Sequence, residues 1–284
     1  GLSLRELVMA RSGQTGKTAL MHATHRGSPT DVIRDFPQRP KADYRAVAQR
    51  LLEVGGSELI GVQDDAGFTV LHTAILRGCN EILDLCLGKA TKETLLLTCR
   101  ESGDTCLHTS VHAYDYADDY AKTMRKLVGV GGMDLVRKAN KRGQTMLHLC
   151  FEGPPDRSAG RARFLLSLDA DLLFIVDKDG RTPADVCVES EMRLRSYSPE
   201  GFQEYTPRDL TRSQSPETKD KRDVFYELSQ EIRMLVALER KTMLALGLHA
   251  RVGAGSSLRL LLGVDDIFRH VLSMSFQEAS QPHI

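Results

Sequence analysis

The chain has 284 residues, of which 41% are apolar, enough for one large domain or two modest ones with a sizeable buried core. Lys plus Arg and Asp plus Glu both total 38, so no part forms a basic arm for nucleic acid. No run reaches the roughly 20 apolar residues of a membrane-spanning helix, and no signal segment opens the chain, so we expect no direct membrane insertion. The six cysteines lie at irregular separations inside apolar runs, which indicates free thiols and an intracellular, cytoplasmic location.

A short helix is predicted at the start of the chain, over Ser3 to Ala10, because Ser3 and Glu6 have the spacing of a capping box. We expect it to be an N-terminal cap. A second short helix follows and ends at Gly27, before a Pro-rich detour from Ser28 to Pro40. The next helix is predicted over Asp43 to Val54, closed by two glycines.

Further helices follow in pairs. A helix that ends at Arg77-Gly78 precedes one over Asn80 to Leu87. A connection over Tyr114 to Tyr120 precedes a helix over Ala121 to Val128. A loop beginning at Gly153-Pro154-Pro155 leads to a helix with four apolar residues, namely Phe164, Leu165, Leu166 and Leu168. The segments 28 to 42, 113 to 121 and 152 to 160 are therefore predicted insertions, and such loops often bind partners.

A short motif recurs at the start of each pair. It reads GKTALMHA from Gly16, GFTVLHTA from Gly67, GDTCLHTS from Gly103, GQTMLHLC from Gly143 and GRTPADVC from Gly180. The glycine suits a tight turn with a left-handed backbone, and the threonine is a preferred helix N-cap. The leucine and alanine point into the layer between neighbouring units, as Leu71 and Ala74 illustrate.

These five segments resemble the ankyrin repeat family, whose hallmark is Gly-x-Thr-Pro-Leu-His-x-Ala with a period near 33. The resemblance covers residues 12 to 190. It implies an all-α ankyrin-repeat solenoid of helix-turn-helix units over residues 1–195. It also implies that the recurrent histidines tie neighbouring turns together, and that a partner protein binds the concave side, on the turn tips and first helices.

A C-terminal region follows the repeats. Residues 196–222 are rich in Ser, Pro and charged residues and predict a mobile linker, with candidate phosphorylation sites at Ser198, Thr206 and Ser215. Residues 223–284 predict two amphipathic helices, over Asp223 to His249 and from Ser256 or Ser257 to Met274. They either cap the end of the stack or form a hairpin that mediates a complex through residues 223–276.

Candidate partner-binding residues lie at the predicted turn tips. They are Asp65, Phe68, Arg100, Asp104, Lys141, Arg142, Gln144, Lys178 and Arg181. Because they carry both charges, they predict a partner surface that also carries both charges. Charged tips are, however, also common as solvated turns without a partner. Phe68 stands apart, because an aromatic ring at an exposed tip is a typical interface anchor.

Catalytic and metal sites are not supported. Gly16-Lys17-Thr18 lacks the earlier glycine of a phosphate-binding loop, since that position is Arg11. His72, His108 and His148 recur at repeat spacing and would lie one layer apart, which cannot close a tetrahedral zinc site, and the spacing of His108 and His112 alone does not complete one. We therefore expect no enzyme activity, no metal and no cofactor.

The leading hypothesis is a protein-interaction module or scaffold subunit that binds one or more proteins in an intracellular assembly of cytoskeletal, ciliary or signalling type. A second hypothesis is a regulatory cytosolic domain of a larger channel or signalling protein, which the opening Gly1 in place of Met keeps open. A third is a fragment of a pathogen effector.

Overall fold

The structure is a computed structural model that describes residues 2–27, 43–111, 120–153, 155–196, 225–234 and 236–237. Within these ranges the chain is helical, with two isolated bridges, Arg11 to Thr18 and Thr98 to Thr105, and no β-strand, so the predicted all-α class is confirmed. The helix predicted after Ser256, most of the linker and the three candidate phosphorylation sites lie outside the described residues. None of the described helices combines the length and apolar character needed to cross a bilayer.

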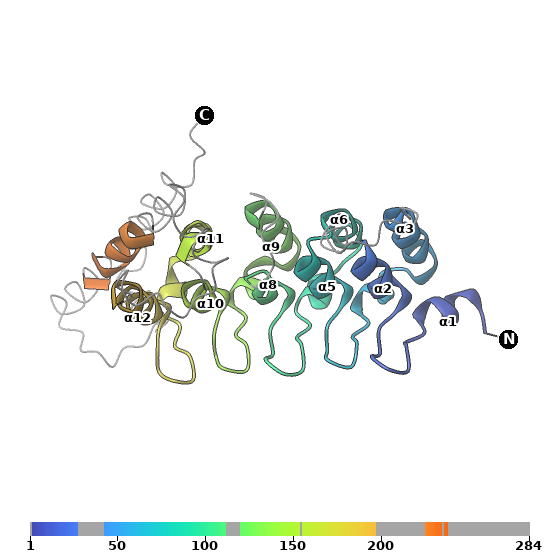
Figure 1. Cartoon of the computed structure of the whole chain (residues 1–284), viewed down its shortest axis with the longest axis horizontal. Coiled ribbons are helices and arrows are strands. Elements are labelled where there is room, and N and C mark those ends of the chain that lie inside the picture. The colour runs from blue at the N-terminus through green and yellow to red at the C-terminus, as the bar shows by residue number, and fades with distance from the viewer. Residues whose placement is uncertain are drawn as a thin grey trace, which may run out of the picture. The chain divides into compact units, whose positions relative to one another are not determined.

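The chain divides into two compact units, residues 1–142 and 143–284, each described by itself (Figure 1). The predicted domain limits at 195 and 222 stay a prediction. The helices of the first unit are α1 (Leu4–Met9), α2 (Ala19–Arg26), α3 (Tyr44–Gly55), α4 (Glu58–Gly61), α5 (Val70–Arg77), α6 (Asn80–Leu87), α7 (Lys92–Leu95), α8 (Cys106–Thr109) and α9 (Tyr120–Arg137). Those of the second are α10 (Met146–Glu152), α11 (Pro155–Leu168), the 3-10 helix η2 (Ala170–Phe174) and α12 (Pro183–Ser196), with further helical residues at 225–234.

The first unit is a stack of helix-turn-helix repeats. Its first helices α2, α5 and α8 pack in one row, and its second helices α3, α6 and α9 pack in another (Figure 1). The motif leucines Leu20, Leu71 and Leu107 are fully buried between layers, as predicted. The fold is therefore of the ankyrin type that the repeat motif implied.

Each repeat closes with a short helical segment that the sequence analysis missed. These segments are α4, α7, the end of α9 and η2. The predicted helix over 121–128 was too short, because the glycines beyond it do not all end the helix. Only Gly132, at φ +66°, breaks the helical backbone, whereas a Cβ on Gly131 would come within 2.5 Å of Leu135, so this glycine allows close packing.

Two predicted insertions lie mainly outside the described residues, but the third is corrected. Residues 152–160 are not a loop, because α11 begins at Pro155. Proline is favoured in the first turn of a helix, where its missing N–H has no partner to lose. Pro155 therefore marks the start of a helix instead of a continuing loop.

The turns require glycine for two reasons, its positive φ angle and the close approach of the next turn. Successive turns of the first unit are joined by backbone hydrogen bonds, from Asp65 to Thr15 (3.1 Å), from Arg100 to Ala66 (2.8 Å) and from Lys141 to Ser102 (2.9 Å). Gly67 has φ +84°, and a Cβ there would lie 2.7 Å from the Arg100 backbone nitrogen. The turns can approach this closely only because glycine has no side chain.

Two glycine substitutions separate these two requirements. Gly180 has φ +78°, and among the described residues nothing lies within 4 Å of a Cβ built on it. We expect Gly180→Ala to lower the free energy of unfolding by about 1 kcal/mol, through backbone strain alone. Gly67→Ala should cost about 3 kcal/mol, because the turns must also separate. Equal losses in urea unfolding would contradict the stacking argument.

The C-terminal helical residues pack on the second unit. Phe225, Leu228 and Ile232 are buried, and these positions lie on the face that the sequence predicted to be apolar. The Ser229 hydroxyl donates to the buried Glu191 carboxylate of α12 at 2.6 Å, and Arg233 pairs with the same carboxylate at 2.7 Å. Residues 225–234 therefore cover α12.

A comparison of one buried and one exposed side chain tests this packing. We expect Phe225→Ala to lower the free energy of unfolding by about 3 kcal/mol, because a ring is removed from a packed layer. Met234→Ala, at a position 66% exposed, should change it by less than about 0.5 kcal/mol. Circular dichroism in denaturant measures both, and equal stability of the two variants would mean that these residues are not part of the core.

Candidate interaction surface

The turns that carry the predicted binding residues are held by a histidine capping arrangement. The Thr69 backbone N–H donates to Nδ1 of His72 at 3.2 Å, and the Thr69 hydroxyl lies 2.8 Å from the same nitrogen. Thr105 with His108 and Thr145 with His148 repeat this geometry. The sequence analysis identified the threonine caps but missed that histidine completes them, although its place three residues after the cap was the signal.

The other ring nitrogen joins one turn to the next. Nε2 of His72 lies 3.3 Å from the Asp104 carbonyl oxygen, and Nε2 of His148 lies 3.2 Å from that of Arg181. A neutral ring with its proton on Nε2 donates to the carbonyl and accepts at Nδ1, so it satisfies both contacts. These histidines are thus structural, as the ankyrin resemblance implied. Within the described part, no three His, Cys, Asp or Glu side chains gather to hold a metal, and His112 lies outside it.

Burial keeps these rings neutral. It lowers the pKa of His72 to about 4, against the opposing effect of the bond to the Asp104 carbonyl, and it also lowers the pKa of His148. Protonation would place a second donor against the Thr69 N–H. The neutral form is therefore part of the folded state.

The lowered pKa predicts a loss of stability in acid. An unfolded histidine titrates near pH 6.5, so between about pH 6.5 and 4 the unfolded chain binds a proton that folded His72 does not bind. The contribution is complete above pH 6.5 and falls by about 3 kcal/mol as the pH drops to 4. We expect His72→Gln to be less stable at pH 7.5 but to show a shallower decline in this window. His22→Gln, at an exposed position of α2, should keep the wild-type slope in unfolding at several pH values.

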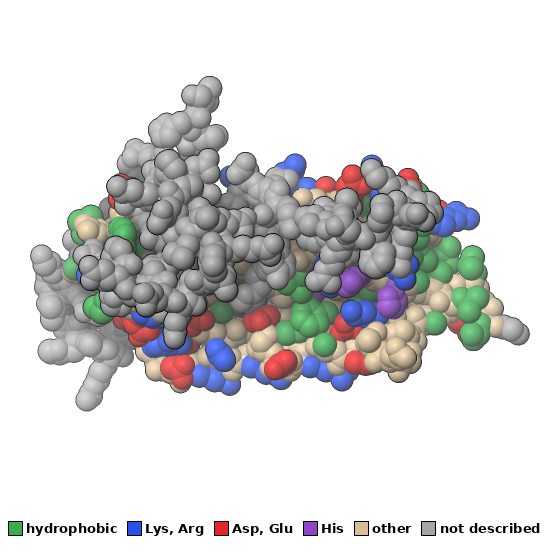
Figure 2. Space-filling view, viewed as in Figure 1, with side chains coloured by type: hydrophobic (Ala, Val, Ile, Leu, Met, Phe, Trp, Pro, Cys, Tyr) green, Lys and Arg blue, Asp and Glu red, His purple; other side chains and the backbone are tan. Residues whose placement is uncertain are grey.

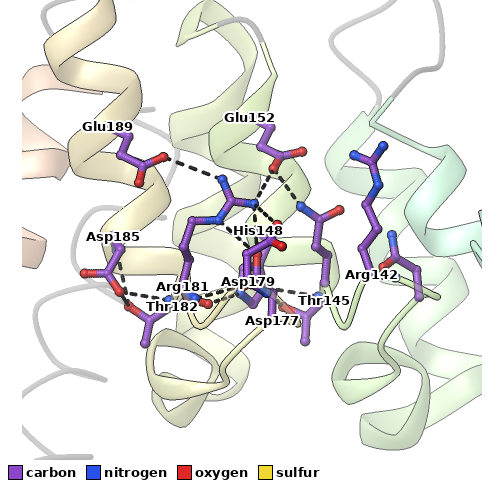
Figure 3. A network of polar contacts seen from close by, with 12 residues as sticks. Arg142, Thr145, His148, Glu152, Asp177, Asp179, Arg181, Thr182, Asp185 and Glu189 are labelled. Atoms are coloured by element: carbon purple, nitrogen blue, oxygen red, sulfur yellow. Dashed lines mark hydrogen bonds and ion pairs between the residues drawn. The ribbon is translucent and has the colours of Figure 1, made fainter.

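The last motif replaces histidine by Asp185 (Figure 3). Its carboxylate accepts from the Thr182 backbone N–H at 2.9 Å and from the Thr182 hydroxyl at 2.7 Å. This completes the cap of α12. A carboxylate has no proton to donate to the carbonyl of a following turn, so the substitution suits the repeat that ends the series.

Arg181 is surrounded by acidic groups within the second unit (Figure 3). Its guanidinium lies 2.9 Å from Asp177, and three more carboxylates lie within 3.4 to 3.6 Å, those of Asp179, Glu152 and Glu189. The hydrogen bond with Asp177 raises the pKa of Arg181. Burial opposes the charge of Asp177, but hydrogen bonds from Arg181 lower the pKa of that carboxyl below its usual value. The charge of Arg181 is thus neutralised inside the protein.

Several other predicted residues also have internal partners. Gln144 is only 1% exposed and donates to Glu152 at 2.6 Å. Asp104 is half-buried and accepts from the Asn140 amide at 2.9 Å. Asp65 is exposed and pairs with Arg11 at 2.6 Å. Phe68 is half-buried, with its ring edge-on to His72 at a centroid distance of 5.6 Å, so it helps to pack the turn and is not a free tip.

Apart from Asp65, the exposed predicted residues are basic. Arg100, Lys141, Arg142 and Lys178 all face solvent. The sequence analysis missed Arg137 and Lys138, which are also exposed, although the run Arg-Lys-Ala-Asn-Lys-Arg was the signal for them. We call the six residues 137–142 the basic tip. It contains four basic side chains and no acidic one.

The other chemically reactive groups are accounted for by architecture. Thr18 caps α2, and its hydroxyl accepts from the Met21 backbone N–H at 3.3 Å. Asp64 is buried in its turn and accepts from the backbone N–H groups of Ala66 and Phe68. All six cysteines are buried, and burial raises the pKa of four of them to about 12, namely Cys86, Cys106, Cys150 and Cys187. These four thiols are therefore protonated and poor nucleophiles near neutral pH.

Comparisons with known proteins give a limited result. No family model matches the chain. No curated protein matches it significantly. Among solved structures, the chain is similar to an ankyrin repeat domain from Acinetobacter baumannii AYE, with a TM-score of 0.49 and 23% sequence identity, over 68% of this chain and 83% of that one. The ankyrin-type fold rests on the repeat geometry described above.

Proposed function

We propose that the chain is a protein-interaction module that binds an acidic segment of a partner protein through the basic tip and the neighbouring turn at Arg100. The supporting observation is the exposure of four basic side chains within six residues, from the end of α9 at Arg137 into the turn at Lys141 and Arg142. Such a concentration of one charge on a surface attracts the opposite charge and speeds its association. Lys178, which is exposed on a turn of the second unit, is a separate candidate contact.

Rigidity of the turns supports this role. The Arg142 backbone N–H donates to the Asn140 side chain at 2.9 Å, and the Lys141 backbone N–H donates to the Ser102 carbonyl of the preceding turn. The basic side chains thus stand on a backbone that is already ordered before a partner arrives. A preordered surface avoids much of the entropy cost of binding.

The packing of residues 225–234 bears on the alternative role of the C-terminal helices. Their apolar side chains are used inside the second unit, which favours a cap over a free helical hairpin for this part. We therefore place partner binding on the turns. Buried cysteine thiols support an intracellular location, and the assembly to which the module belongs is a cytoplasmic scaffold or the regulatory part of a larger signalling protein.

Charge reversal with a matched control tests the proposed function. The tagged full chain is used to capture proteins from native extract, and the captured proteins are quantified by mass spectrometry. We expect Lys141→Glu with Arg142→Glu to reduce the main captured protein at least about tenfold, because repulsion replaces attraction. Arg45→Glu with Arg50→Glu makes the same change in net charge on α3 and should leave capture unchanged.

The same extract at raised salt provides a second measurement. Capture that depends on the basic tip should weaken as ionic strength rises, because exposed charges are screened. Equal capture by wild type and by both double variants would contradict the basic tip as the binding surface. If the main captured protein has no acidic segment, the proposed partner class is contradicted.

A further inference from the structure

The helix α1 exposes an apolar face at the end of the first unit. Leu2, Leu4 and Leu7 are 67%, 64% and 54% exposed, and Figure 2 shows hydrophobic side chains gathered at the end that carries α1. The next residue, Val8, is buried against α3, since a Cβ on Gly55 would come within 3.1 Å of it. One side of α1 is therefore packed in the manner of a core segment, while the other side is open.

The register of the repeats shows that Leu7 occupies a core position. Leu7 stands five residues before Ser12, whose backbone N–H donates to Lys17 across the turn. The same offset before Asp64, Asn140 and Asp177, which open the corresponding turns, gives Leu59, Leu135 and Leu172. These three leucines are at most 1% exposed. The remaining repeat has Thr94, half-buried, at this position.

In the other repeats this position is covered by the second helix of the same repeat. A Cβ on Gly55, at the end of α3, would come within 2.8 Å of Leu59, and one on Gly131 would come within 2.5 Å of Leu135. In the second unit α11 packs on η2, which contains Leu172. The segment α1 corresponds to α4 and η2, and among the described residues no second helix of its own repeat covers Leu7.

The neighbouring helix α3 gives a second, independent observation. The inner helix α6 packs between α3 and α9 and buries two adjacent apolar stripes, Ile82 with Cys86 and Leu83 with Leu87. The helix α3 buries one stripe, formed by Ala48, Leu52 and Gly55. Its adjacent stripe, Val47 with Leu51 and Val54, is left open, with Val47 45% exposed and the other two half-buried. The row of second helices thus has an unfilled apolar side at α3.

We propose that the face formed by Leu2, Leu4 and Leu7, together with the Val47 stripe of α3, binds an amphipathic helix of a partner protein, packed beside α3 as α3 packs beside α6. The occupant presents an apolar stripe to both helices and a small residue to Leu7, as Gly55 does to Leu59. Such a helix continues the α3–α6–α9 row, and its binding is independent of the basic tip.

A tethered helix tests this docking face in the full chain. A copy of residues 43–56, the helix that already covers Leu59, is joined ahead of Gly1 through a flexible Gly-Ser linker, which holds it at high effective concentration without fixing its register. We expect the melting temperature to rise by about 3 °C or more, because exposed leucines become buried. The matched control is the same extension with Ser at the copied positions of Ala48, Leu51 and Leu52, and it should give no rise.

A double variant checks where the tethered helix binds. Leu4→Ser with Leu7→Ser should hardly alter the melting temperature of the unextended chain, because both side chains are exposed, but it should abolish the rise in the extended chain. Equal melting of the extended chain and its control would overturn the proposal. Sedimentation of the unextended chain provides the other arm, since a dimer that the double variant dissociates would assign the face to a second copy instead.

Discussion

The contact of each turn with the next is the constraint on which the repeats depend. A neutral imidazole fixes the first turn of its own helix through Nδ1 and holds the following turn through Nε2, and backbone hydrogen bonds between turns add to this contact. The contact distance leaves no room for a Cβ at Gly67. Variation in length between repeats is consequently placed in the helices and their connections, while the turn keeps its residues.

Both ends of the series depart from this arrangement. In the first motif, the histidine position is occupied by the buried Met21, and the first two turns are joined by the ion pair of Arg11 with Asp65 and by a backbone bond. In the last motif, Asp185 keeps the cap but has no proton for a following turn. The Asp185 substitution is therefore explained by its place in the last motif, whereas Met21 has no structural explanation.

Much of the fold could be predicted from the sequence because the motif residues act locally. Thr18 and Ser3 cap helices through neighbours three residues away, and Asn80 to Leu87 forms the predicted helix at its predicted limits. The short closing helices were missed because residues such as Leu59 and Leu135 owe their burial to a packed neighbour and not to a local pattern. In the sequence, Gly131 is typical of a helix end. The structure shows that it instead allows close packing against Leu135.

The candidate surface was predicted less well, for a related reason. Sequence places a charged residue at a tip but does not show whether it already has a partner. Arg181 and Asp104 interact with other side chains of the same unit, and Gln144 is buried, so charge or polarity alone overstated their availability. Arg142 and Lys141 are exposed on a turn that contains no acidic residue, although the Lys141 ammonium donates to the Arg100 carbonyl oxygen.

The covering of α12 by residues 225–234 has a consequence for the order in which the protein opens. In a linear array each layer is stabilised only by its neighbours, so unfolding begins where a layer has one neighbour and proceeds inward. The carboxylate of Glu191 accepts from Ser229 and pairs with Arg233, and these contacts hold residues 225–234 on α12. Amide hydrogen exchange should therefore be slower in α12, whose outer side is covered, than in α1, whose outer side is open.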